Sequence, residues 1–168
     1  MNSCKAIGVS VVVGLLMVGS VIAGDTTTSP GRNSVHVSTI AVALPAGVET
    51  VMLAGTIVRG KHGQVLTVDA SVGSVAPGEA GSFRPRVNGV AFETTDDFGT
   101  GSSASIICAS PGVYGCTGTG HWWIDLDAAE AAHPGTFIGK PLSIELVGGG
   151  LGGPIGVSAN MSARLEKK

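Results

Sequence analysis

Hydrophobic and polar residues alternate with a period of two over much of the chain after residue 33. The alternation is clearest in residues 64–73 and in the last apolar segment, residues 155–165. Successive side chains of a β-strand point to opposite faces of a sheet, so this pattern predicts strands with one buried face. In the first of these segments the residues expected to face the core are Leu66, Val68, Ala70 and Val72.

Other segments rich in β-branched residues predict further strands. They cover Ser34–Leu44 and residues 48–58, 83–87, 90–95, 104–109, 116–126 and 141–147. Asn88-Gly89 separates two of them, and this dipeptide favours a two-residue hairpin turn. The expected fold class is therefore all-β, an antiparallel β-sandwich or jelly roll of about eight or nine strands.

One short helix is predicted after the strand at 116–126. Asp127 is followed by Glu130, a capping-box spacing in which both side chains satisfy the first backbone N–H groups of a helix. Pro134 is expected to end this helix. The glycine-rich residues 148–153 precede the last strand, and we expect them to form a mobile or sharply turning loop.

The first 23 residues follow a different pattern. Lys5 precedes an uncharged apolar run over residues 6–23, and polar residues begin just after Gly24. This order is typical of a secretory signal peptide, with cleavage expected after Ala23. An uncleaved anchor is the alternative, because a helix of this length extends about 27 Å. With cleavage, the chain is expected to be secreted or periplasmic and to keep no membrane segment.

Residues 24–33 are rich in Thr, Ser, Gly and Pro, which predicts a flexible leader before a single domain at 34–168. Export also bears on the cysteines, because Cys4 leaves with the signal and Cys108 and Cys116 enter an oxidising compartment. We expect these two to form a disulfide that closes a loop of about nine residues and stabilises the fold by about 2.5 kcal/mol. A thiolate ligand or nucleophile is the alternative.

Composition narrows the range of partners. The chain has ten Lys and Arg residues against twelve Asp and Glu, with no basic cluster longer than Lys167-Lys168. Nucleic acid is therefore not an expected partner. In general character the sequence is similar to small exported bacterial β-sandwich proteins. An envelope protein, a second copy of the chain or a surface polysaccharide is the partner that such a protein would bind.

Most motifs that carry chemistry fail when their context is considered. Residues 148–153 contain the glycines of a dinucleotide-binding fingerprint, but Pro154 and a strand follow instead of a helix. Residues 135–141 are one residue too short between glycines for a phosphate-binding loop. No Gly-x-Ser-x-Gly sequence marks a nucleophile, and no two histidines have the spacing of a local zinc site. We therefore expect no cofactor and no metal.

His121, Trp123 and Asp125 are the strongest candidates for a binding site. Strand alternation puts all three on the face opposite Trp122. An imidazole, an indole and a carboxylate on one face could stack against a sugar ring and bind its hydroxyl groups. The alternative is structural, with Trp123 covered by another element or by a partner subunit.

Asp125, Asp127 and Glu130 also lie within six residues of one another. With His121 they could form the site of a hydrolase or a metal-dependent enzyme. The simpler interpretation is that Asp125 is an outward strand residue, while Asp127 and Glu130 cap the helix. The sequence thus favours an exported, non-catalytic protein with a structural, adhesive or binding role at the envelope or outside the cell. Its alternatives are a carbohydrate-binding module using Trp123 and an enzyme built on these carboxylates.

Overall fold

The computed structural model describes residues 26–27, 33–74, 80–92, 106–109 and 117–168. The predicted signal peptide, residues 1–23, lies outside these ranges, and so does Cys116, one half of the expected disulfide. Within the described ranges, no helix is both long enough and apolar enough to cross a membrane.

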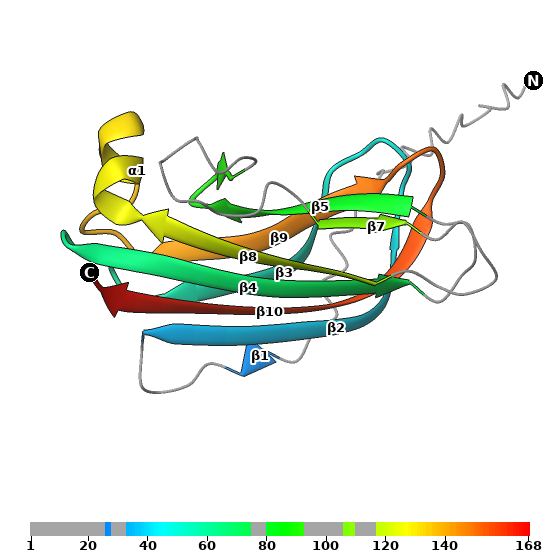
Figure 1. Ribbon diagram of the computed structural model, residues 1–168, viewed down its shortest axis with the longest axis horizontal. Helices are drawn as coiled ribbons and strands as arrows, with labels where there is room; N and C mark the ends of the chain where they lie inside the picture. Colours follow the sequence, from blue (N-terminus) through cyan, green and yellow to red (C-terminus); the bar gives the residue numbers. More distant parts are fainter. Residues whose placement is uncertain (1–25, 28–32, 75–79, 93–105, 110–116) are drawn as a thin grey trace, which may run out of the picture.

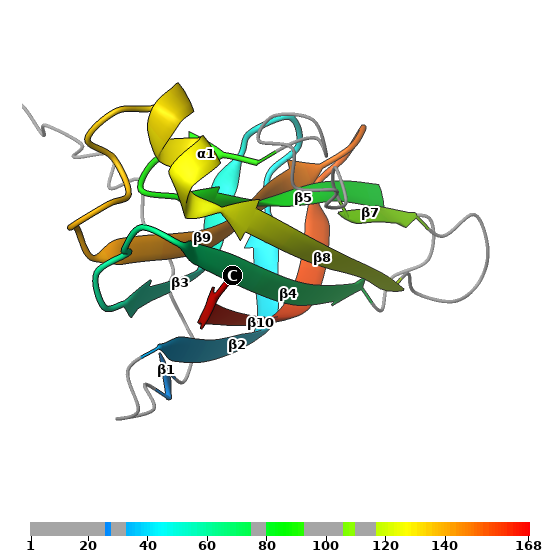
Figure 2. The ribbon, with the colours of Figure 1, turned by 60° about the vertical axis from the view of Figure 1, so that its left-hand side comes forward.

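The strands form two antiparallel sheets that pack face to face (Figures 1 and 2). The front sheet contains, in spatial order, β1 (Thr26–Thr27), β2 (Ser34–Leu44), β10 (Ile155–Lys167), β4 (Gln64–Ser74) and β8 (Thr117–Asp125). The back sheet contains β3 (Thr50–Ile57), β9 (Leu142–Gly150) and β5 (Ala80–Val87), with β6 (Val90–Ala91) and β7 (Ile106–Ala109) paired along the other side of β5. Helix α1 (Leu126–Ala132) follows β8. The predicted all-β sandwich with one short helix is confirmed.

Consecutive long strands alternate between the two sheets. β2, β4, β8 and β10 belong to the front sheet, and β3, β5 and β9 belong to the back sheet. The first and last of the long strands, β2 and β10, are hydrogen-bonded neighbours. This alternation and this order, β2-β10-β4-β8 against β3-β9-β5, are those of a jelly roll.

The core lies between the inner faces of the two sheets. On β4 the four residues predicted to face inward are all buried, and on β8 Trp122 and Ile124 are completely enclosed. Phe83 of β5 and Leu146 of β9 close the core from the back sheet. Removing an aromatic side chain from such a core costs about 3–5 kcal/mol, so this layer carries much of the stability of the fold.

The turn between β5 and β6 shows how the sequence determines a connection. Asn88 and Gly89 have positive φ values of 48° and 84° and join β5 to β6, which confirms the predicted hairpin.

Near the N-terminus, Thr26 and Thr27 pair with β2, so a short strand lies within the segment expected to be a flexible leader.

The prediction that residues 148–153 form a loop is wrong for the first three of them, because β9 continues through Gly150. Gly148 lies against the buried ring of Phe83. A Cβ atom at this position would collide with Phe83 and would lie 2.6 Å from the backbone oxygen of Ser82. Glycine here makes room for an aromatic ring, and the turn is confined to the residues around Gly152, which has a φ of 82°.

Candidate functional site

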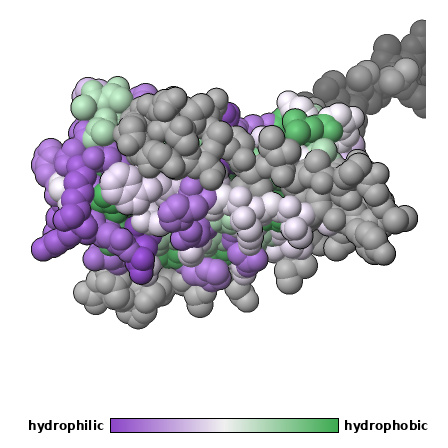
Figure 3. All heavy atoms as spheres, viewed as in Figure 1, coloured by the Kyte–Doolittle hydropathy of each residue, from purple (hydrophilic) through white to green (hydrophobic). Residues whose placement is uncertain are grey.

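His121 and Trp123 lie on the outer face of the front sheet. Both side chains are exposed, Trp123 to 40%, whereas Trp122 between them is completely buried. The predicted orientation of the two tryptophans is therefore confirmed. Figure 3 shows this face, on which hydrophilic and weakly polar residues predominate over the strands.

The register of the front sheet arranges these residues in rows that cross four strands. The central row consists of successive cross-strand partners His36, Ser162, Asp69 and His121. On one side of it lies the amide row, which consists of Ser38, Asn160, Ser71 and Thr119. On the other side lies the tryptophan row, which consists of Ser34, Arg164, Thr67 and Trp123. Strands lie about 4.8 Å apart, so each row is about 14 Å long.

Two hollows lie over these rows and together form what we call the outer-face groove. One hollow of about 500 Å³ is lined mainly by the amide and central rows. A second of about 370 Å³ is lined by three residues of the central row, His36, Asp69 and Ser162, and by Ser34 and Arg164 of the tryptophan row. The same three residues also line the first hollow, so the two hollows adjoin along them. Trp123 lies beside the groove, at the β8 end of its row.

Asp69 is the functional residue that sequence reasoning missed. Its Oδ1 lies 2.5 Å from Nδ1 of His121, and both side chains are more than half exposed. The contact orients the imidazole, since Nδ1 is engaged and Nε2 is the ring nitrogen that remains for a ligand. The alternation of β4 had already placed Asp69 on the outer face, but only the pairing of β4 with β8 brings it beside His121.

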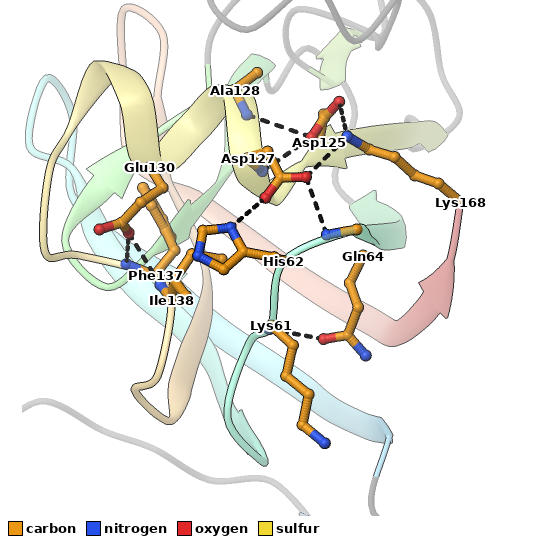
Figure 4. Close-up of polar contacts among 11 residues, drawn as sticks. Lys61, His62, Gln64, Asp125, Asp127, Ala128, Glu130, Phe137, Ile138 and Lys168 are labelled. Atoms are coloured by element: carbon orange, nitrogen blue, oxygen red, sulfur yellow. Dashed lines mark hydrogen bonds and ion pairs between the residues drawn. The ribbon is translucent and has the colours of Figure 1, made fainter.

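Asp125, the third residue of the predicted binding site, lines neither hollow of the groove. It is the N-cap of α1, and its Oδ1 accepts hydrogen bonds from the backbone N–H groups of Asp127 at 2.9 Å and Ala128 at 3.3 Å. Its other oxygen lies 2.6 Å from Nζ of Lys168 (Figure 4). Burial raises the pKa of Asp125, but Lys168 and the two backbone N–H groups outweigh it and lower the pKa overall.

The predicted capping box is therefore wrong, because the helix begins one residue before Asp127. Asp127 instead connects three segments of the chain. Its carboxylate accepts a hydrogen bond from the backbone N–H of Gly63 at 3.0 Å and lies 2.8 Å from Nδ1 of His62 and 3.2 Å from Nζ of Lys168. The Gly63 hydrogen bond, followed by those of His62 and Lys168, lowers the pKa of Asp127 to about 2.

Glu130 likewise has a structural role. Its carboxylate accepts backbone hydrogen bonds from Phe137 at 2.7 Å and from Ile138 at 2.9 Å (Figure 4). It also accepts one from the backbone N–H of Gly135. The bonds from Ile138 and Phe137 contribute most to lowering its pKa. Glu130 thereby holds the segment that follows α1, in which Phe137 is completely buried.

The structure thus places His121 apart from the three carboxylates with which it would have formed an enzyme site. His121 lines the outer-face groove, whereas Asp125, Asp127 and Glu130 bind backbone N–H groups around α1 and line neither hollow. We call these three carboxylates, together with His62 and Lys168, the helix-end cluster. In the part of the chain that the structure describes, no three His, Cys, Asp or Glu side chains come together as a metal site.

Comparisons with known proteins add no family to this geometry. No protein-family model matches the sequence, and no curated protein is significantly similar to it.

Proposed function

We propose that the chain is exported, loses residues 1–23 and acts at the cell envelope or outside the cell as a non-catalytic carbohydrate-binding module. The outer-face groove is its binding site. The observation that carries this proposal is a pair of adjoining hollows whose walls are built from hydroxyl, amide, imidazole and carboxylate groups on four neighbouring strands.

The chemistry of these side chains matches that of a sugar. Pyranose hydroxyl groups donate and accept hydrogen bonds, and Asn160, Asp69 and the imidazoles of His36 and His121 supply both kinds of partner. The small side chains of Ser71 and Ser162 lie between them and leave the backbone accessible to a flat ring. Trp123, exposed beside the groove, offers an aromatic surface for stacking.

A binding role is favoured over hydrolysis by the number of acidic groups at the site. Glycoside hydrolysis generally uses two carboxyl groups on either side of the scissile bond. Asp69 is the one carboxylate among the described residues that line the two hollows. The exposure of Asp69 and His121 to water also contrasts with the shielded surroundings in which catalytic acid and base groups are usually tuned.

Binding of the mature chain, residues 24–168, to an array of plant, fungal and bacterial glycans tests the proposal. We expect binding by the unaltered chain and its loss in His121→Ala and Trp123→Ala. His62→Ala is a matched control, because His62 is also an exposed histidine paired with an aspartate, outside the groove. Failure of the unaltered chain to bind any glycan, or equal loss in the His62 variant, would contradict the proposed site.

Export is tested separately. When the full chain is expressed with its own N-terminus in a bacterial host, we expect the protein outside the cytoplasm to begin at Gly24. Edman sequencing or intact mass measurement identifies this end. A chain that keeps residues 1–23 and sediments with membranes would support the anchor instead.

A further inference from the structure

We infer that the outer-face groove binds an internal stretch of a linear, uncharged glycan, several sugar units long, that lies along β10 and β4. This inference rests on the proposed carbohydrate-binding function and specifies its ligand. It comes from three properties of the groove, which are its length, the strand residues that line it and the pairing of its charges.

The length of the groove exceeds that of one sugar ring. Adjacent rows are two residues apart along a strand, or roughly 6.7 Å, so the three rows extend over about 13 Å. The two hollows adjoin at His36, Asp69 and Ser162, and from there one extends to the amide row and the other to Ser34 and Arg164 of the tryptophan row. A single pyranose ring is shorter than this distance.

The described lining residues come from strands. Within the ranges that the structure describes, each residue that lines either hollow belongs to β2, β4, β8 or β10. Sites that recognise the end of a chain need a wall that stops it, and loops usually supply such walls. A groove built on the face of a sheet instead favours a ligand that continues past both ends.

The charged groups of the groove already have partners. Asp69 lies beside His121, and the Arg164 guanidinium forms an ion pair with Glu166, its neighbour on the same face of β10. The other polar side chains of the groove are hydroxyls, the amide of Asn160 and the imidazole of His36. An uncharged ligand can use these groups without breaking either pair, whereas a polyanion would have to compete with Glu166 for Arg164 and would approach Asp69.

Isothermal titration calorimetry with defined oligosaccharides tests this inference. The probes are cello-, chito- and manno-oligosaccharides from the monosaccharide to the hexasaccharide, with oligogalacturonides as the anionic series. For the neutral series that binds, we expect affinity to rise at least about tenfold between the disaccharide and the tetrasaccharide and then to level off. Asn160→Ala in the amide row and Trp123→Ala in the tryptophan row should each weaken binding of the tetrasaccharide more than binding of the disaccharide.

The possible failures distinguish this inference from the proposed function. A monosaccharide that binds as tightly as the hexasaccharide would overturn the inference and leave carbohydrate binding intact. Preference for oligogalacturonides, with affinity that falls steeply as salt is added, would overturn the uncharged ligand. Absence of binding to every series would overturn the proposed function itself. His62→Ala should match the unaltered chain throughout.

Discussion

The outer-face groove and the helix-end cluster both contain carboxylate and imidazole groups, yet these groups have different partners in the two regions. In the helix-end cluster, the carboxylates of Asp125, Asp127 and Glu130 each accept hydrogen bonds from backbone N–H groups, and the pKa of each is lowered. In the groove, Asp69 contacts a side chain, His121, and both remain more than half exposed. Each region contains one histidine paired with one aspartate, at similar distances.

The contribution of a carboxylate to stability therefore depends on whether its partner is the backbone or a side chain, and not on its proximity to a histidine. A carboxylate that accepts hydrogen bonds from backbone N–H groups pairs donors that folding would otherwise leave without partners. It therefore stabilises the folded chain. A carboxylate paired with an exposed side chain on a sheet adds little stability, since water competes for both groups. Stability measurements can therefore separate the two regions.

The largest expected effect comes from acid, because it acts on the whole helix-end cluster at once. All three carboxylates have lowered pKa values in the folded chain, that of Asp127 to about 2. Unfolded Asp and Glu titrate near pH 4, so the stabilisation is complete above about pH 5 and is lost as the pH falls toward 2. We expect the melting temperature, followed by circular dichroism, to fall over this range.

The variant Asp127→Asn assigns part of this fall to one residue. An amide does not titrate, so the variant should be less stable at neutral pH and its melting temperature should depend less on pH between 5 and 2. Asp69→Asn, the matched change in the groove, should have little effect on stability at neutral pH, because the side chain of Asp69 is more than half exposed. Identical pH profiles for the unaltered chain and Asp127→Asn would contradict the role given to Asp127.

A smaller effect is expected when the cap of α1 is removed. Asp125→Ala loses two backbone hydrogen bonds and the contact with Lys168. N-cap replacements by alanine cost about 1 kcal/mol, and up to about 2 kcal/mol where further contacts are lost. Urea denaturation should show this decrease in the free energy of unfolding. Asp125→Asn keeps an oxygen that can cap the helix, so it should recover most of the loss; equal losses in both variants would point to Lys168 instead of the cap.

The helix-end cluster also marks the limit of what the sequence could predict. Alternation correctly assigned Trp122 to the core and Trp123 and Asp69 to the outside, because side-chain direction in a strand depends only on local geometry. The choice between Asp125 and Asp127 as the N-cap was wrong, since two aspartates near one helix start offer the same local signal. Asp127 is engaged instead by His62 and Gly63, more than sixty residues away, which no local pattern reveals.

The groove could not be predicted from the sequence for a related reason. Its rows depend on the order β2-β10-β4-β8, in which no two neighbours are consecutive in the chain. The contact between Asp69 and His121 spans 52 residues. Gly148 was misassigned because a loop and a close approach of Phe83 both require glycine, and only the packing of the two sheets distinguishes them.

The smallest expected effect is on the stability of the groove itself. Asp69→Ala and His121→Ala should each change the free energy of unfolding by less than about 0.5 kcal/mol, because both side chains are exposed and neither supports the core. A double-mutant cycle measures their coupling, which should also stay below about 0.5 kcal/mol. A coupling well above 1 kcal/mol would give this pair a structural role, like that of the Asp127 carboxylate. A small coupling, together with loss of glycan binding in both variants, would mean that these residues contribute to recognition and not to the fold.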